Sequence, residues 1–309
     1  MENVAMQSPK TGEKKLKRLT KGKKIVLSTI YYVCGTLLAV LFLFPLVYML
    51  STSTKSESSY ASDAGTLMMF LPDFQNLKSA ADNYGKVFTE YGIWRYAVNS
   101  FIYAAVIIVL NVIVNGLAGY VMAKFDFPGK GFFSFVILFL IVVPVETSII
   151  PLYSIVKILL RLKGTMSVLA VILPSTISVF NIFLFMQFFE SIPKEYEEAA
   201  RIDGAGSLLI FFSIILPLSK PIVATVATFC FIGTWNDYLW PTMVLPYAEN
   251  GAWPLYPIQS AITSIQSIQG ITTGEIMAAL IVTSVPIFIV YVVAQKYIMQ
   301  GFGTAGLKM

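Results

Sequence analysis

Three groups of polar residues interrupt the apolar background of this chain, and their side chains are of kinds that bind partners or solutes. The segment EYEEAARIDGAG at 195–206 places four carboxylates, two adjacent alanines and two glycines within twelve positions. Glu146 lies in the middle of the apolar run IVVPVETSIIPLY, and Trp235, Asn236 and Asp237 follow one another late in a further run. An ionisable group inside a bilayer is costly unless it faces protein or water. These groups predict a surface for a charged partner and a polar path through a membrane.

Enzymatic chemistry has little support in this composition. The chain contains no histidine, which removes the commonest general base and metal ligand. Its two cysteines, Cys34 and Cys230, both fall within apolar runs, where a free cysteine behaves as a small hydrophobic residue. The sequence has no phosphate-binding loop of the kind that ATPases use. We therefore expect no catalytic residue, no metal site and no cofactor held by this chain.

The composition predicts an all-α integral membrane protein. Only 13% of the residues are charged and the mean hydropathy is +0.73, whereas roughly 25% of residues are charged in soluble domains. A helical span needs about 20 predominantly apolar residues, and the alternation typical of β-barrel strands does not occur here. We predict six transmembrane helices, at about 25–50, 98–123, 132–155, 166–188, 220–243 and 276–297.

The basic residues predict that both termini are cytoplasmic. Eight of the 22 Lys and Arg residues lie in the first 24 positions, and 15 of the 22 fall in segments that this orientation places inside the cell. The cluster of Lys157, Arg161 and Lys163 opposes the assignment, because it falls in an outside segment. We expect a basic tail at 1–24, the first span with a long extracytoplasmic loop at 25–91, a core transmembrane domain at 92–297 and a cytoplasmic tail at 298–309.

The carboxylate-rich segment predicts a short cytoplasmic helix. Carboxylates in its first turn favour the positive end of the helix dipole, and Gly204 suits its end. One side carries small and charged residues at spacings of three and four, which lets another backbone approach closely. These residues are Tyr196, Ala199, Ala200 and Asp203. A solvated loop helix, whose charges only keep it out of the bilayer, is the alternative.

The apolar decamer SLLIFFSIIL at 207–216 predicts an interfacial or re-entrant helix on the cytoplasmic side. It is too short to span a bilayer that requires about 20 residues. Pro217 and Pro221 would break a straight helix running from the decamer into the next segment. The fifth span is therefore expected to begin after Pro217.

The spacing of residues 198–217 resembles the EAA motif of permease subunits in bacterial ATP-binding cassette (ABC) importers. The tripeptide at 198–200 is followed after three residues by Gly204, and after nine more by Ile-x-Leu-Pro at 214–217. Further segments resemble the carbohydrate-importer branch that includes the maltose-type permeases, and the layout resembles the smaller permease of such a pair. These segments are Asn99-Ser100, GYVMAKFDFPGK at 119–130, IIPLY at 149–153, TWNDYLWP at 234–241 and the C-terminal QKYIMQGFGTAGLKM. The resemblance covers residues 92–309 well and the first hundred only loosely.

This resemblance implies the fold and the partners of a type I importer permease in the bacterial cytoplasmic membrane. The helix that carries Glu198 to Gly204 would dock in a groove of a separate ATPase subunit, which binds ATP and Mg, and would transmit closure of the ATPase dimer to the membrane domain. The other implied partners are a second homologous permease, an extracytoplasmic solute-binding protein, a carbohydrate substrate and the surrounding lipid, without nucleic acid. The ATPase-coupling residues carried over from the motif are Glu198, Ala199, Ala200, Asp203, Gly204, Leu216 and Pro217.

Polar residues of the spans are candidates for the translocation path. Aromatic faces beside amide and carboxylate groups suit a pyranose, whose apolar face stacks while its hydroxyls form hydrogen bonds. The candidates are Glu146, Tyr153, Asn181, Trp235, Asn236 and Asp237. The alternatives are a structural carboxylate at Glu146 and an aromatic belt with a buried polar clasp around Trp235. The resemblance also implies that the tail from Gly301 to Lys308 contacts the ATPase dimer.

These features favour an importer permease for oligosaccharides or sugar derivatives and leave three competitors. An ABC permease for a non-sugar solute would share the same motif. An ion- or proton-driven secondary transporter would also use Glu146, but it gives no reason for the spacing from Glu198 to Pro217. A membrane scaffold that recruits a cytosolic protein through the same helix would tolerate loss of Glu146.

Overall fold

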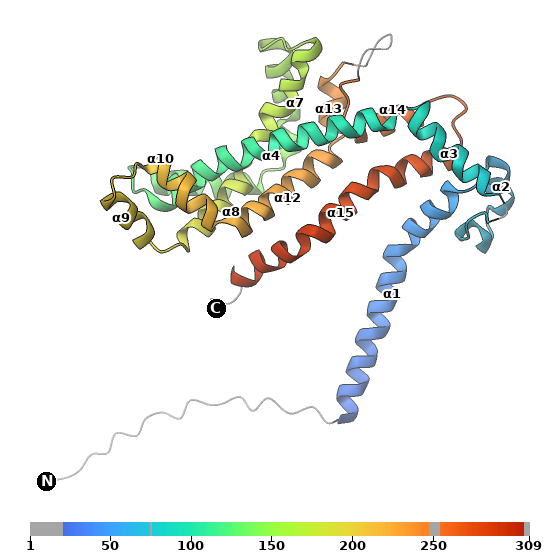
Figure 1. Ribbon diagram of the computed structural model, residues 1–309, viewed down its shortest axis with the longest axis horizontal. Helices are drawn as coiled ribbons and strands as arrows, with labels where there is room; N and C mark the ends of the chain where they lie inside the picture. Colours follow the sequence, from blue (N-terminus) through green and yellow to red (C-terminus); the bar gives the residue numbers. More distant parts are fainter. Residues whose placement is uncertain (1–20, 75, 247–253, 306–309) are drawn as a thin grey trace. The chain divides into compact units, whose positions relative to one another are not determined.

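The computed structural model describes residues 21–74, 76–246 and 254–305, and these residues contain helices and no strand (Figure 1). The chain divides into two units, residues 1–48 and 49–309. Helix α1 (Lys21–Ser53) carries the chain from the first unit into the second. The predicted all-α class is confirmed for the described residues. Residues 1–20 of the basic tail expected at 1–24 lie outside the described residues.

The second unit is built from long helices joined by short helical segments. Its α-helices are α2 (Glu57–Asp63), α3 (Leu77–Thr89), α4 (Ile93–Lys124), α5 (Lys130–Val142), α6 (Ile149–Ser154), α7 (Ser167–Thr176), α8 (Val179–Glu190), α9 (Glu195–Ile202), α10 (Ser207–Ile210), α11 (Leu216–Leu218), α12 (Lys220–Asn236), α13 (Leu239–Val244), α14 (Ile258–Gln266) and α15 (Thr273–Ala305). The 3-10 helices are η1 (Leu67–Phe70), η2 (Val145–Ser148) and η4 (Gly164–Met166), and the π-helices are η3 (Ile155–Leu159) and η5 (Phe211–Ile215).

Three helices are long and apolar enough to cross a bilayer without a break. They are Ser28–Ser53 of α1, Ile93–Lys124 of α4 and Thr273–Gln295 of α15. At about 1.5 Å per residue, each exceeds the roughly 30 Å hydrocarbon core. Helix α4 contains no proline, so no missing N–H interrupts its hydrogen-bond ladder. These helices correspond to the first, second and sixth predicted spans.

The third and fourth predicted spans are each a pair of helices bent at a short break, where the sequence predicts continuous helices. The fifth predicted span begins after Pro217, as expected, and the decamer at 207–216 belongs to a separate helical segment bent away from it. The bends are 99° between Lys130–Val142 and Val145–Leu159, 42° between Gly164–Thr176 and Val179–Glu190, and 84° between Ser207–Leu218 and Lys220–Asn236. Extended backbone at Pro144 ends the first helix of the first pair. Pro221 lies in the first turn of α12 after the last break, where its missing N–H costs no helical hydrogen bond. Counting each pair as one span brings the total to the predicted six.

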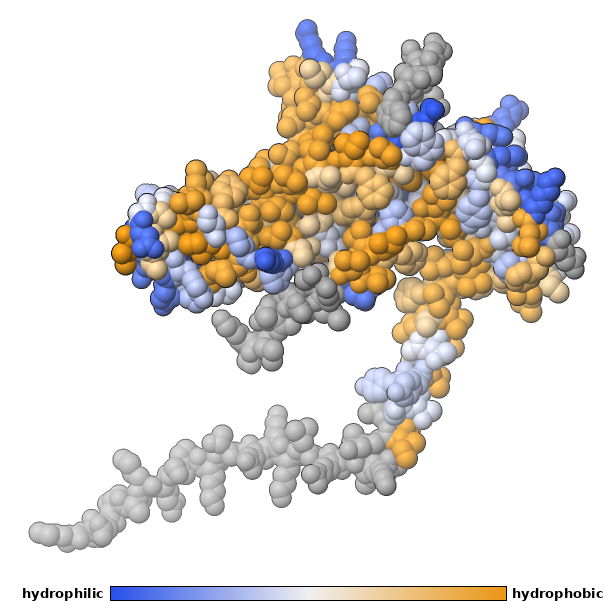
Figure 2. All heavy atoms as spheres, viewed as in Figure 1, coloured by the Kyte–Doolittle hydropathy of each residue, from blue (hydrophilic) through white to orange (hydrophobic). Residues whose placement is uncertain are grey.

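Helix α4 is the element around which the second unit is organised. It extends from the end that holds α2 and α3 to the end that holds α9 and α10 (Figure 1). Apolar side chains cover much of the surface between these ends, and hydrophilic side chains gather toward the ends and at the top of the view above α7 (Figure 2). Helices α8 and α12 pack along α4. Gly119 of α4 permits the close approach of α8, since a Cβ there would lie 2.6 Å from the Cβ of Phe185.

Candidate functional site

Helix α9 is the short helix that the carboxylate-rich segment predicts. Three carboxylates lie in its first turn and Arg201 in its last, which complements the helix dipole at both ends. The helix ends in a Schellman motif, because Gly204 N–H donates to Arg201 O at 3.0 Å and Ala205 N–H donates to Ala200 O at 2.9 Å. Gly204 has a φ of +83°, which a residue with a side chain adopts only with strain.

The outward side of α9 is exposed and mixed in character. Ile202 is 87% exposed and Tyr196 is 52% exposed, although both side chains carry large apolar surfaces. Glu198, Ala199 and Asp203 are exposed beside them. Exposed apolar residues with a charged rim are typical of a surface that binds another protein.

The inward side of α9 packs against its own chain. Ala200 is 8% exposed and belongs to a core cluster with Tyr120, Phe189 and Phe211. The sequence predicts both alanines on the side open to a partner. The structure turns Ala200 inward, because adjacent residues of a helix point about 100° apart. Of the two alanines, only Ala199 is exposed on the outward side.

Glu197 is the residue of this helix that the sequence reasoning missed. It is 7% exposed, accepts a hydrogen bond from Tyr120 Oη at 3.1 Å and lies 3.3 Å from Lys124 Nζ. Lys124 also donates to the carbonyl oxygen of Ile192 at 2.6 Å. The signal in the sequence is the three-residue spacing of Glu197 and Ala200, which places both on one helix face.

The last two residues of the predicted coupling set lie beyond α9. Leu216 is half-buried and packs against the cluster that contains Ala200. Pro217 is exposed and lies just before the 84° bend into α12. The segment from Glu198 to Pro217 therefore includes most of α9 and reaches the bend that leads into α12.

A cavity of about 290 Å³ opens beside the break between α7 and α8. Helix α4 and the start of α8 form one wall, and the second half of α12 forms the other. The polar and aromatic lining includes Asn111, Phe180, Asn181, Phe229, Thr234 and Asp237. Helices α4, α8 and α12 therefore all contribute to one polar cavity in the second unit.

Asparagines of α4 bond to the backbone groups that this break leaves free. Asn115 Nδ2 donates to Thr176 O at 2.9 Å, and its Oδ1 accepts from Ser178 N at 3.0 Å. Asn111 Nδ2 donates to Ser175 O at 3.4 Å, and Asn111 Oδ1 accepts from the side-chain Nδ2 of Asn181 at 2.9 Å. Because buried polar groups need such partners, the bend explains why two asparagines occur in the middle of a membrane-spanning helix.

The cavity combines a carboxylate with aromatic rings. Asp237 lines it, and one oxygen of Asp237 accepts from Trp240 N at 3.3 Å. Phe180 and Phe229 supply the rings, with centroids 6.1 Å apart. Ring faces beside hydroxyl, amide and carboxylate groups are what a pyranose requires of a binding surface.

Trp235 is part of the protein core and does not line the cavity. It has no exposed surface, and its Nε1–H donates to Thr283 O at 3.0 Å. Its ring stacks on Phe231 with centroids 5.4 Å apart. In this structure the ring faces the protein, as in the buried-clasp alternative, and has no surface to offer a solute.

Three other candidates for the path are not among the lining residues of the cavity. Glu146 is exposed in η2, at the 99° bend after α5, and Tyr153 is 36% exposed in α6. Asn236 is exposed at the end of α12. The structure brings Asn181 and Asp237 to one cavity and leaves these three outside it.

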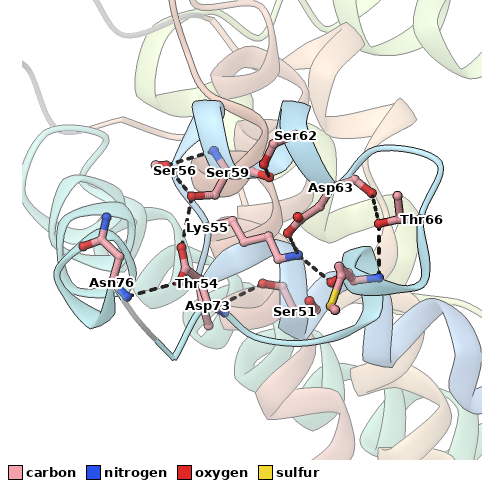
Figure 3. Close-up of polar contacts among 11 residues, drawn as sticks. Ser51, Thr54, Lys55, Ser56, Ser59, Ser62, Asp63, Thr66, Asp73 and Asn76 are labelled. Carbon is pink, nitrogen blue, oxygen red and sulfur yellow. Dashed lines mark hydrogen bonds and ion pairs between the residues drawn. The ribbon is translucent and has the colours of Figure 1, made fainter.

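A polar network around Lys55 folds the segment between α1 and α3 (Figure 3). Lys55 is 1% exposed, and its Nζ donates to Asp63 Oδ2 at 2.7 Å and to Met68 O at 2.8 Å. Thr54 Oγ1 accepts from Asp73 N at 3.1 Å (Figure 3). The named partners all come from the same segment, so the network holds a loop in shape.

At the same end of the unit, Glu275 fastens α15 to the residues before α4. Glu275 is 2% exposed and accepts from Lys86 Nζ at 2.7 Å and from Tyr91 Oη at 2.6 Å. The hydrogen bond to Glu275 raises the pKa of Lys86, and burial raises the pKa of the Tyr91 hydroxyl. The stability that Lys86 contributes is complete below its ordinary pKa of 10.5 and is lost as pH rises through the raised value.

The predicted C-terminal tail begins inside a helix. Helix α15 continues to Ala305, so the backbone at 301–305 is helical. The rest of the tail, residues 306–309, lies outside the described residues, and with it part of the predicted contact from Gly301 to Lys308.

The chain is similar to known transport proteins in its sequence and in its fold. The sequence profile of the family described as "Binding-protein-dependent transport system inner membrane component" matches residues 115–303. The chain is 30% identical to the arabinooligosaccharides transport system permease protein AraQ of Halalkalibacterium halodurans, over 92% of this chain and 97% of that one. It is 32% identical to the diacetylchitobiose uptake system permease protein NgcG of Streptomyces coelicolor, over 84% of this chain and 82% of that one.

Two further similarities concern a different solute and a solved structure. The chain is 32% identical to the sn-glycerol-3-phosphate transport system permease protein UgpE of Yersinia pestis, over 85% of this chain and 91% of that one. Its fold matches a chain in the crystal structure of a bacterial ABC transporter involved in the import of the acidic polysaccharide alginate, with a TM-score of 0.74 and 26% identity. That match covers 90% of this chain and 98% of the other.

Proposed function

The chain belongs to the family of binding-protein-dependent transport system inner membrane components, and on this premise we propose that it carries an oligosaccharide or sugar derivative into the cell. It is a permease subunit of an ABC importer, a transport component and not an enzyme, located in the membrane. Such an importer works with an ATPase and with a solute-binding protein. We assign the chain to the smaller-permease position beside a second, homologous permease. The secondary-transporter and scaffold alternatives have no counterpart among these relatives.

The proposed orientation places α9 in the cytoplasm and α2, α3 and α14 outside. Its support is the opposite placement of these elements within the second unit and the gathering of hydrophilic side chains toward the two ends (Figures 1 and 2). The positive-inside bias of the sequence favours the same orientation. Both termini are then cytoplasmic if each bent pair counts as one span.

The observation that carries the coupling role is that α9 is exposed on one side and buried on the other. Its outward side offers Tyr196, Ala199 and Ile202 to a groove of the ATPase, with Glu198 and Asp203 as a charged rim. Its inward side is buried against the end of α4. A short helix supported in this way is suited to passing a rigid-body movement into the membrane. ATP and Mg are held by the ATPase partner.

The sugar assignment is supported by relatives and by the chemistry of the cavity. Two relatives are named for arabinooligosaccharides and diacetylchitobiose, and a third for sn-glycerol 3-phosphate. The phenylalanine rings beside Asn181, Thr234 and Asp237 suit a sugar ring. At about 290 Å³ the cavity is smaller than most ligand pockets, which run from about 300 to 1,000 Å³. We therefore propose that the second permease completes it, with Glu146, Tyr153 and Asn236 lying on surfaces that face the shared path.

The coupling role is tested by Gly204→Asp in the full complex with its host ATPase and second permease. We expect ATP hydrolysis stimulated by the solute-binding protein to fall roughly tenfold or more, because charge and bulk at the end of α9 obstruct docking. Gly204 is exposed and a Cβ added there meets nothing within 4 Å, so the substitution leaves the interior of the chain intact.

The matched control is Gly65→Asp, which makes the same substitution at a φ of +80° with equally open space around it. Gly65 lies in the segment between α2 and η1, at the opposite end of the unit. Its backbone strain should equal that at Gly204, whereas stimulated hydrolysis should stay at the level of the unmodified chain. Equal losses in the two variants, or no loss in either, would show that α9 is not the docking helix.

The cavity is tested by filling it with Gly233→Leu. Gly233 lines the cavity, and a Cβ added there meets nothing within 4 Å, so the leucine occupies the hollow without displacing the core. We expect uptake of the transported sugar to fall about tenfold while the ATPase still copurifies with the chain. Gly131→Leu, at an equally open position of α5, is the control and should leave uptake unchanged. Normal uptake by Gly233→Leu would exclude the cavity from the path.

A further inference from the structure

We propose that Glu197, Lys124 and Tyr120 form the joint through which α9 moves α4, and through α4 the cavity. We call these three residues the clasp. The inference rests on the proposed role of α9 as the ATPase-docking helix and adds the route by which a push on that helix reaches the solute. Glu197 is not part of the matched motif at 198–200, and Tyr120 and Lys124 belong to a different span.

The covalent connections of α9 are poorly suited to this task. Four residues, 191–194, join it to α8, and a Schellman turn at Gly204 joins it to α10. Both are turns, whereas a rigid-body movement requires a stiff attachment. The clasp is a third attachment, made by side chains. Arg201, one turn further along α9, adds to it by lying 5.9 Å from the ring centroid of Phe125, which follows α4 directly.

Helix α4 is the element best able to carry the movement onward. It is unbroken over 32 residues and contains no proline, whereas the other routes toward the cavity pass through bends of 42° and 84°. Tyr120 lies nine residues from Asn111, or about 14 Å along the helix. Asn111 and Ile107 line the cavity. A displacement of the clasp is therefore delivered directly to the cavity wall.

The clasp contains an ion pair, although an apolar contact at this place would stabilise the fold at least as well. The side chains of Lys124 and Glu197 are 3% and 9% exposed. Glu197 Oε1 has no hydrogen-bond partner among the described residues, although it lies 3.3 Å from Lys124 Nζ, and the same ammonium donates to Ile192 O. Buried ion pairs are often replaceable by apolar residues without loss of stability. The pair is thus better explained as a directional joint than as packing.

The test measures how accessible the cavity wall is to a reagent, so the transported solute does not have to be known. A cysteine is placed in the cavity wall with Gly233→Cys, in a chain that also carries Cys34→Ser and Cys230→Ala, and the full complex with ATPase and second permease is used. The rate of reaction with a membrane-impermeant maleimide is compared without nucleotide and with ATP plus vanadate. With the clasp intact we expect the two rates to differ about fivefold or more.

Breaking the clasp should abolish this difference while the complex stays assembled. Glu197→Gln removes the charge at nearly constant shape, and we expect the ratio of rates to fall below about twofold with the ATPase still copurifying. The exchange of Glu197→Lys with Lys124→Glu should recover at least about half of the ratio. Tyr120→Phe, which removes one hydrogen bond and is the variant safest for folding, should give an intermediate ratio. Asp126→Asn, at an exposed ion pair nearby, is the control and should give the ratio of the intact chain.

The outcomes distinguish three cases: a clasp that transmits movement, a clasp that only stabilises the fold, and a failure of the proposed docking role of α9. An unchanged ratio in Glu197→Gln overturns the inference, as does a loss that occurs only together with loss of the ATPase or of thermal stability. A failure of the charge exchange to recover any of the ratio excludes the ion pair as the joint. If the intact chain shows no ATP-dependent difference, the docking role of α9 fails and the inference fails with it.

Discussion

Gly119→Ala is expected to destabilise the second unit by roughly 3 kcal/mol or more, the upper range for overpacking a core. The added Cβ would lie 2.6 Å from the Cβ of Phe185, 3.0 Å from Met186 N and 3.1 Å from Ile182 O. Two of these three atoms belong to the backbone of α8 and cannot rotate away. Helices α4 and α8 must separate to admit the methyl group, and the packing of Phe185 is lost with their contact.

Thermal unfolding of the detergent-solubilised chain measures this effect. A loss of 3 kcal/mol corresponds to a fall of about 6 °C or more in the unfolding temperature. The matched control is Gly85→Ala, because Gly85 is also within a helix, is exposed and has nothing within 4 Å of an added Cβ. It should be neutral or stabilise by up to about 1 kcal/mol through helix propensity. If Gly119→Ala unfolds at the temperature of Gly85→Ala, α4 and α8 do not pack as described.

Trp235→Ala is expected to cost about 3–5 kcal/mol of unfolding free energy, the usual range for deleting a buried aromatic side chain. Trp235 has no exposed surface, stacks on Phe231 and lies edge-on to Phe101 with centroids 4.9 Å apart. Its removal leaves a cavity between α12 and α15 and leaves Thr283 O without the indole donor. We therefore expect loss of folded protein, with any loss of uptake following from it.

Neighbouring substitutions separate this core role from contact with a solute. Trp235→Phe keeps the ring but not the N–H group and should cost less, about 1–3 kcal/mol. Asn236→Ala changes the next residue, which is exposed, and should alter stability by less than about 0.5 kcal/mol. Unfolding temperature and yield of folded chain are the measurements. A Trp235→Ala chain that is fully stable but has lost sugar uptake would show that the indole faces the solute instead of the core.

The two predictions together define what must stay rigid for the clasp to work. Gly119 is the residue just before Tyr120, so the close packing of α4 on α8 lies beside the joint that connects α4 to α9. Trp235 holds α12 against α15 on the other side of the cavity. A movement of α4 changes the shape of the cavity only if α12, which lines the opposite wall, stays in place. The packing of Trp235 against α15 holds α12 there.

Local properties of the sequence sufficed for the membrane class, for the three unbroken spans and for the position of the short helix α9. Apolar runs of about 20 residues identify spans because the bilayer thickness is constant. The residues of α9 carry their own start and stop signals, the first-turn carboxylates and Gly204, so its position is encoded within a dozen residues. The motif from Glu198 to Pro217 was recognisable for the same reason, since it is a pattern of spacing along the chain.

Only the tertiary structure decided which side chains meet. The break between α7 and α8 is stabilised by a partner from elsewhere in the chain, Asn115, which bonds to Thr176 and Ser178, 61 and 63 residues away. The burial of Ala200 and Trp235 follows from what packs against them, and a span's apolar character does not distinguish lipid from protein neighbours. Glu197 gave no sign of its partner because Lys124 lies at the far end of a different helix. Local signals determine where helices begin and end, and contacts between distant residues determine which helix faces are buried and which stay exposed.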